Sequence, residues 1–238
     1  MDALSTAVET RALEIGLRGI SVNPVTSHDI SQKEAMHRGY KSCGLELAAA
    51  PHGQFKGLVK EDCIAQRESL MHCFKYISSS LPMVAHVPIR HRDIVRRIYE
   101  NLEQPFQLGD PAPSNSPGDY TINFDRNWQK GLISVISADL NQWPVILRAA
   151  EDLEKFGGAE VVNLDLPLAQ PASALICEQA EKSGFFFSGI WPCAAQDGDN
   201  LRLQRLINQL DMSRLCIYSE FGRVPFDYVT SQMVAAQT

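Results

Sequence analysis

The chain has 238 residues and a net charge of -6, with 45% hydrophobic and 21% charged residues, which is ordinary for a soluble globular protein. The acidic balance argues against a nucleic-acid partner, because phosphate binding needs a basic surface. No apolar run reaches the roughly 18 residues of a membrane span and the N-terminus has no signal pattern, so we expect a cytoplasmic protein with no membrane or nucleic-acid partner.

The first half of the chain predicts alternating helices and strands. Its opening helix has apolar residues at three- and four-residue steps (Leu4, Val8, Ala12, Ile15) and ends by Gly19. The elements expected after it are a strand over 20–22, a helix stopped by Gly39, a strand ending at Pro51, a strand over 69–76, and a strand and closing helix over 84–102.

Residues 104–119 are predicted to form a surface linker. Four prolines (Pro105, Pro111, Pro113 and Pro117) occur there without apolar periodicity, and proline disfavours both helix interiors and central strands. Two strands rich in β-branched residues, 120–124 and 132–136, are expected next as a hairpin. This hairpin has no counterpart ahead of the opening helix.

The second half repeats the order of the first. Its elements are a helix with Ile146, Ala149, Leu153 and Phe156 that ends at Gly157-Gly158, a strand over 161–164, a helix stopped by Gly184, a strand ending at Pro192, a strand over 201–207, and a strand and closing helix over 215–234. The clearest match aligns Glu34-Ala-Met-His-Arg-Gly-Tyr-Lys-Ser-Cys-Gly44 with Gln179-Ala-Glu-Lys-Ser-Gly-Phe-Phe-Phe-Ser-Gly189.

This repetition predicts an α/β (α+β) protein of two tandem lobes, with mixed sheets flanked by helices. The lobes are residues 1–103 and 120–238, joined by the linker 104–119. A first lobe without opening strands would leave a sheet edge exposed. We therefore expect extensive contact between the lobes, a sheet continuous across them, or a homodimer.

The cysteines do not suggest a metal site. Zinc ligands usually come in closely spaced pairs, and no C-x-x-C spacing occurs. Buried, reduced thiols are the prediction for all six: Cys43, Cys63, Cys73, Cys177, Cys193 and Cys216.

The order strand, helix, strand, helix, strand, strand, with Gly39-Tyr40 and Gly184-Phe185 closing the second helices, resembles the GNAT (acyl-CoA N-acyltransferase) fold. Three segments look like the duplicated GNAT-like region of bacterial proteins that carry a histidine-kinase-type ATPase domain: His86-Val-Pro-Ile-Arg-His-Arg-Asp-Ile-Val-Arg-Arg-Ile-Tyr99, Gly184-Phe-Phe-Phe-Ser-Gly-Ile-Trp-Pro192 and Leu201-Arg-Leu-Gln204. The resemblance covers nearly the whole chain outside the linker.

The resemblance implies two features that this sequence lacks. GNAT proteins cradle the acyl-CoA pyrophosphate in a glycine-rich turn before a helix, whereas this chain has Ser137-Ala-Asp-Leu-Asn-Gln-Trp-Pro144, in which Asp139 would repel phosphate. The family often places a general-acid Tyr where Ala35 and Ala180 stand here. Acetyl-CoA or CoA stays open as a cofactor, but the standard pyrophosphate loop is absent.

Several residues are candidates for a site. Arg90 and Arg92 belong to a basic cluster on the predicted helix ending at 102, which is either a solvated face or an anion-docking or partner-docking patch. Glu68 lies at the start of a predicted strand, where it is either an exposed or inter-lobe charge or a catalytic base near His72. His91 is a second candidate base.

The loop after the first strand is a further candidate. Open α/β sheets bind ligands at the carboxyl ends of strands, which favours Asn23, His28 and Asp165 as ligand-binding residues. Turn and cap chemistry explains these residue types equally well.

We therefore expect a degenerate GNAT-like protein that acts as a binding or regulatory module, with a protein partner or a second copy. The alternative is an acyl-CoA-dependent N-acyltransferase with a non-standard site, in which Glu68 or His91 is the base. A third hypothesis is a module of an ATPase-linked signalling protein.

Overall fold

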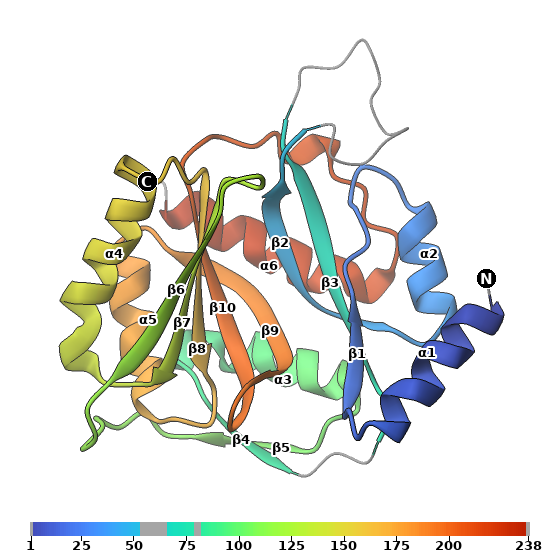
Figure 1. Ribbon diagram of the computed structural model, residues 1–238, viewed down its shortest axis with the longest axis horizontal. Helices are drawn as coiled ribbons and strands as arrows, with labels where there is room; N and C mark the ends of the chain where they lie inside the picture. The colour runs from blue at the N-terminus through green and yellow to red at the C-terminus, as the bar shows by residue number, and fades with distance from the viewer. Residues whose placement is uncertain (1, 53–65, 79–81, 237–238) are drawn as a thin grey trace.

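The computed structural model describes residues 2–52, 66–78 and 82–236 (Figure 1), with side chains from Thr6 onward, so the predictions for the Cys63 thiol and the Leu4 side chain lie outside the described part. The described helices are α1 (Asp2–Glu14), α2 (Ile30–His37), α3 (Arg92–Leu102), α4 (Trp143–Lys155), α5 (Ala172–Lys182) and α6 (Glu220–Ala236), with short 3-10 turns η1 (Ile89–His91), η2 (Leu140–Gln142) and η3 (Met212–Arg214). The strands are β1 (Gly19–Val22), β2 (Lys41–Ala50), β3 (Glu68–Tyr76), β4 (Met83–His86), β5 (Phe106–Gly109), β6 (Asp119–Asp125), β7 (Lys130–Ser137), β8 (Val161–Pro167), β9 (Phe186–Ala195) and β10 (Gly198–Leu206).

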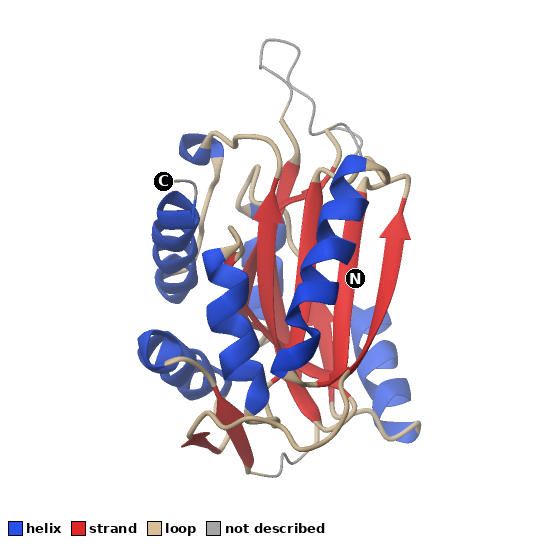
Figure 2. Cartoon of the chain, turned by 90° about the vertical axis from the view of Figure 1, so that its left-hand side faces the viewer, coloured by secondary structure: helices blue, strands red, loops and turns tan. Residues whose placement is uncertain are grey.

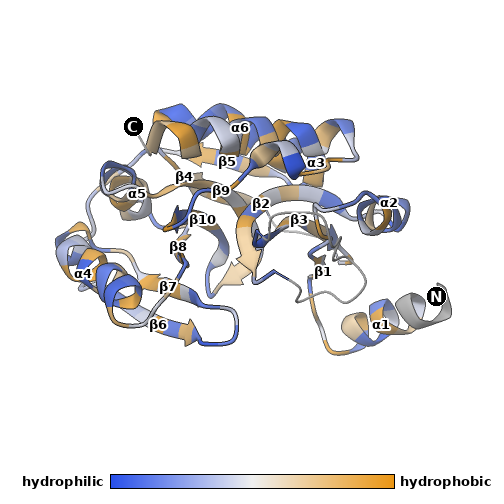
Figure 3. Ribbon diagram, turned by 90° about the horizontal axis from the view of Figure 1, so that it is seen from above, coloured by the Kyte–Doolittle hydropathy of each residue, from blue (hydrophilic) through white to orange (hydrophobic). Residues whose placement is uncertain are grey.

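Eight of these strands form one mixed sheet in the order β1-β3-β2-β9-β10-β8-β7-β6. Helices lie on both sides of it (Figure 2), and α3 and α6 lie side by side across β2 and β9 (Figure 3). The predicted α/β class is therefore confirmed. The sheet is also continuous from the first half of the chain to the second, which was one of the expected arrangements.

The two halves share one order of elements. Strands β1, β3 and β2 are neighbours in the same sequence as β8, β10 and β9, and α1 and α2 precede and separate them as α4 and α5 do. The glycines that end α2 and α5 both have a left-handed backbone, with φ +81° at Gly39 and φ +84° at Gly184. Glycine reaches this conformation without a steric penalty, which is why both helices stop there.

The halves meet where two glycines touch. Gly44 of β2 and Gly189 of β9 form the one register pair between these strands in the described sheet. A Cβ on Gly189 would lie 2.3 Å from Gly44 Cα and 2.7 Å from Cys43 O, so the two backbones approach more closely than any side chain allows.

Past this contact, side chains of β9 and β10 take the place of the missing backbone ladder between β2 and β9. Gln204 of β10 accepts a hydrogen bond from Leu47 N–H at 2.8 Å and donates one to Leu47 O at 3.2 Å. Ser188 of β9 donates to Leu45 O at 2.8 Å. Buried backbone groups must be paired, and here the second half of the chain pairs those of the first.

Three local predictions need correction or comment. The strand expected at the start of 215–234 is absent, because residues 215–219 bond the loop after β1 instead, with Cys216 N–H donating to Thr26 O at 2.6 Å. The strand that was expected to end at Pro192 continues past it, because β9 runs to Ala195. The register between β9 and β10 shifts in the segment that contains Pro192. Within the expected linker, Phe106–Gly109 forms β5 and pairs in parallel with β4 in a separate two-stranded sheet.

One hydrophobic core extends through both halves. The buried residues of α3 are the predicted Ile94, Val95, Ile98 and Leu102, together with Tyr99. Among the described thiols, Cys43, Cys73 and Cys177 are buried, while Cys193 and Cys216 are half-buried. Within the residues described, none of the helices combines the length and apolarity required to cross a membrane.

Candidate functional site

Five polar or aromatic side chains from five strands meet near the junction of the halves. We call them the central polar cluster: Glu46 (β2), His72 (β3), Asp165 (β8), Trp191 (β9) and Arg202 (β10). All five are buried, with at most 8% of each residue exposed. A buried group of this kind needs a specific set of partners, because an unpaired charge inside a protein is costly.

Arg202 holds the acidic members of the cluster together. Its Nε and Nη2 donate to the two carboxylate oxygens of Asp165 at 2.6 and 2.7 Å, and its Nη1 lies 3.5 Å from Glu46 Oε2. The guanidinium is also 4.1 Å from the centroid of the Trp191 ring. Bidentate pairing and cation–π contact both suit the planar arginine group.

His72 stacks on the same tryptophan. The His72 and Trp191 rings are parallel within 3°, with centroids 4.4 Å apart. His72 Nδ1 lies 2.7 Å from Asn23 Oδ1, so the side-chain amide oxygen accepts the Nδ1 proton. Burial and the neighbouring Arg202 charge lower the pKa of His72 to about 3, and the ring is neutral at pH 7.

Glu46 stays ionised in spite of its burial. Burial alone would raise its pKa, but the charges of Arg202 and Lys130, together with a hydrogen bond from Asn163, lower the pKa to about 2. Lys130 Nζ is 3.0 Å and Asn163 Nδ2 2.7 Å from Glu46 Oε1. The charged side chains of the cluster and Lys130 therefore neutralise one another through ion pairs.

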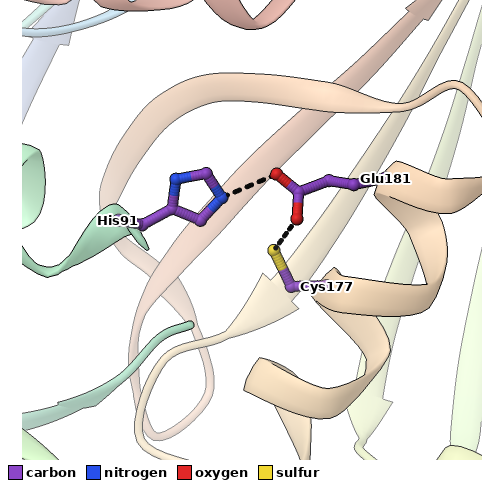
Figure 4. Close-up of side chains that lie close together, drawn as sticks. All are labelled: His91, Cys177 and Glu181. Carbon is purple, nitrogen blue, oxygen red and sulfur yellow. Dashed lines mark hydrogen bonds and ion pairs between the residues drawn. The ribbon is translucent and has the colours of Figure 1, made fainter. Parts of the chain in front are cut away.

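A second group, the histidine cluster, connects η1 with α5 and α6. It consists of His91, Cys177, Glu181 and Tyr228, and Figure 4 shows the first three converging. His91 Nε2 is 2.8 Å from Glu181 Oε1, and His91 Nδ1 is 2.7 Å from the Tyr228 hydroxyl. The Cys177 thiol donates to Glu181 Oε2 at 3.8 Å, and the exposed Arg90 guanidinium pairs with the same carboxylate.

The histidine cluster is not arranged as a base or a nucleophile. His91 is fully buried, both of its nitrogens are engaged, and burial with the Arg90 charge lowers its pKa to about 3. Burial also raises the pKa of Cys177 to about 12, and this thiol contacts the carboxylate rather than the imidazole. The imidazole therefore has no nitrogen available to activate it.

The structure unites only some of the predicted site residues. Asp165 belongs to the central polar cluster and Asn23 bonds its member His72, but Asp165 lies inside β8 and not in a loop at the end of that strand. Two other predicted candidates make contacts outside this cluster: His28 Nδ1 accepts a hydrogen bond from Ile30 N–H at 3.2 Å, and Arg92 pairs with Asp110 at 2.8 Å. Glu68 begins β3, and its carboxylate has no hydrogen bond or ion pair among the described residues.

The charged residue just before β3 connects the two halves of the chain. Arg67, just before β3, donates to Trp128 O at 2.6 Å and lies 3.5 Å from Glu160, both in the second half. The ion pair of Arg67 links the start of β3 to the second half of the chain, whereas Glu68, for which an inter-lobe charge was one of the expected roles, has no such partner among the described residues. Glu46, Trp191 and Arg202 were not predicted, although the alternation Leu201-Arg-Leu-Gln204 places both polar side chains on one strand face.

The turn ahead of α4 is closed by its own side chains. Asp139 accepts a hydrogen bond from Asn141 N–H at 3.0 Å, and Gln142 Nε2 donates to Gly118 O at 2.6 Å. Ala35 and Ala180 are both buried and pack into the core.

Comparison with known proteins identifies no relative. The chain matches no protein-family model, no curated protein and no solved structure.

Proposed function

We propose that the chain is a GNAT-like protein that acts as a binding or regulatory module rather than as an acyltransferase. The observation that carries this proposal is the turn ahead of α4. A phosphate there would meet the carboxylate of Asp139, which already caps the turn by accepting the N–H of Asn141. Like charges repel, and the N–H group that an anion would need is partnered.

Two further observations support a non-catalytic role. The positions expected for a general acid are alanines within the core. His91, the candidate base, has both nitrogens engaged. The order β7, α4, β8, α5, β9, β10 is the strand, helix, strand, helix, strand, strand order on which the resemblance rests, and it supports the fold assignment in the proposal.

The first test is thermal unfolding with and without millimolar acetyl-CoA or CoA. A ligand that binds only the folded state raises the melting temperature. We expect no shift with either compound. A concentration-dependent rise would contradict the proposal and favour the acyl-CoA-dependent alternative, and Asp139→Gly would then be expected to enlarge the rise.

The surface best suited to a partner is the edge of the sheet at β1, beside α1. Among the described residues β1 pairs with β3 alone, whereas its counterpart β8 pairs with β10 on one side and with the parallel strand β7 on the other. Next to this edge, about half of the surface of Val8, Ile15 and Leu17 is exposed, and the three side chains line an apolar groove of about 360 Å³. We propose that an extended, apolar segment of a partner protein pairs with β1, as β7 does with β8.

The backbone of β1 identifies which groups face this partner. Ile77 N–H donates to Arg18 O and Met71 N–H donates to Pro24 O, so even-numbered residues bond β3. In an antiparallel ladder, residue pairs that are hydrogen-bonded alternate with pairs that are not. Ser21 belongs to a pair that is not, so its N–H points away from β3.

Ser21→Pro tests the edge because it removes this outward N–H and leaves the bonds to β3 in place. We expect the immobilised wild-type protein and Ser21→Ala to capture the same partner, and Ser21→Pro to lose it while keeping its melting temperature. Equal capture by all three proteins would contradict docking at the edge. Capture of a second copy alone, or dimerisation abolished by Ser21→Pro, would identify the homodimer as the occupant.

A further inference from the structure

Three side chains with metal-binding atoms converge beneath the surface at α5. Cys177 and Glu181 are four residues apart and lie on the same face of this helix, and His91 approaches them from the end of η1 (Figure 4). The imidazole nitrogen, the thiol sulfur and a carboxylate oxygen all lie within 4.8 Å of one another. These segments are far apart in the sequence, so tertiary folding creates the group.

The spacing is close to that of a coordination sphere. Tetrahedral zinc with N, O and S ligands places its donor atoms about 3.3–3.6 Å apart. Here the N–O distance between His91 and Glu181 is 2.8 Å, and the S–O distance between Cys177 and Glu181 is 3.8 Å. Side-chain rotations would have to open the first distance, close the second, and bring the imidazole nitrogen and the sulfur, which lie within 4.8 Å of each other, to the same spacing.

The surrounding hydrogen bonds orient His91 as a ligand. The Tyr228 hydroxyl oxygen lies 2.7 Å from His91 Nδ1 and 3.0 Å from Arg90 O, so it fixes the imidazole from the side away from Glu181. His91 Nε2 faces Glu181 Oε1 at 2.8 Å, and a cation bound there would take the place of the proton shared between these two atoms, with the ring proton on Nδ1. A hydrogen bond to the distal nitrogen is the usual support of a histidine ligand.

Arg90 extends from this group to the surface. Its guanidinium pairs with Glu181, but 46% of its side chain is exposed, and Arg90 and Glu181 together line a surface cavity of about 260 Å³. Rotation of this arginine into solvent would free the carboxylate and admit an ion with a water molecule as fourth ligand.

We propose that His91, Cys177 and Glu181 form a binding site for Zn²⁺ or a similar divalent transition-metal ion, with Arg90 as its gate. Binding replaces the thiol proton of Cys177, which is released to solvent, and leaves Arg90 charged and solvated. Affinity therefore rises with pH, because each bound ion displaces one proton from a thiol.

The experiment uses the full chain, stripped of metal with a chelator. Co²⁺ is titrated in first, since a cobalt–thiolate bond gives a charge-transfer absorption band, and Zn²⁺ affinity is then measured by competition with a chromophoric chelator. We expect one equivalent to bind, with the band lost in Cys177→Ser and retained in Cys216→Ser, a control at a half-buried thiol outside the cluster.

Arg90→Gln distinguishes a metal site from a structural ion pair. Removing a positive charge next to a bound cation should tighten Zn²⁺ binding by at least about 10-fold. A purely structural ion pair would lose stability in this variant and gain no affinity. Glu181→Gln should weaken binding while the protein stays folded by circular dichroism.

Two results would overturn the proposal. One is the absence of Co²⁺ and Zn²⁺ binding in both the folded wild type and Arg90→Gln. The other is binding that Cys177→Ser and Glu181→Gln leave unchanged, which would place the ion elsewhere.

Discussion

At the scale of single residues, the contact between Gly44 and Gly189 leaves no room for a side chain at position 189. Gly189→Ala would place a Cβ 2.3 Å from Gly44 Cα at a backbone φ of +146°, and we expect a loss of roughly 3 kcal/mol or more in the free energy of unfolding. Gly158→Ala is the matched control, because its φ is +74° but nothing lies within 4 Å, so only about 1 kcal/mol should be lost. Urea denaturation measures both, and equal losses would contradict the steric argument.

The buried histidines predict a second residue-scale effect, on the pH dependence of stability. The pKa of His72 is about 3 in the folded protein and near 6.5 in the unfolded chain, so between these values the unfolded state binds more protons. Stability is then fully present above pH 6.5 and falls as the pH decreases, by about 2 kcal/mol for this histidine between pH 6.5 and 5. His91 behaves in the same way.

His72→Gln should remove one of these two contributions. We expect urea unfolding at pH 5 and 7 to show a smaller difference in the variant than in the wild type. An unchanged difference would mean that His72 does not titrate as its surroundings indicate.

At the scale of elements, the side-chain amide of Gln204 replaces the backbone hydrogen bonds that a neighbouring strand would make to β2. It is fully buried, and its amide bonds both the N–H and the C=O of Leu47. Gln204→Leu would leave these two backbone groups unpaired, which should cost roughly 2–4 kcal/mol in the free energy of unfolding. Gln66 makes the same pair of bonds to Asp211 in an exposed position, so Gln66→Leu should cost less than about 1 kcal/mol because water replaces them.

Elements were also the scale at which sequence patterns predicted most. Apolar periodicity predicted α1 and α4, and the stops at Gly39 and Gly184 predicted where α2 and α5 end, because these signals act within one segment. The pairing of β2 with β9 rests on a close contact between two glycines that are far apart in the sequence, and no local pattern specifies such a contact. For the same reason the sequence did not predict the central polar cluster as a group: Asp165 and His72 were candidates on separate grounds, and Arg202, which joins the carboxylates of the cluster, was missed.

At the scale of the whole molecule, the halves share one core and should not fold separately. Helix α6 belongs to the second half but packs on β2 as well as β9, and α3 of the first half packs on β9 as well as β2. We expect the fragments 1–103 and 104–238 each to lack cooperative thermal unfolding, and to recover it when they are co-expressed. A cooperative transition in either fragment alone would show that it is an independent domain.

The glycine contact between the halves also constrains how the gene can change. A methyl group on Gly189 would lie 2.3 Å from Gly44 Cα, and one on Gly44 would lie 2.9 Å from the Trp191 ring and 3.1 Å from Ser188 O, so enlarging one residue cannot rescue a substitution at the other. Each of the two codons is therefore constrained on its own, and both should stay glycine throughout any lineage that keeps this junction. A pooled library randomised at codons 44 and 189 and sorted for folded protein should return glycine at both.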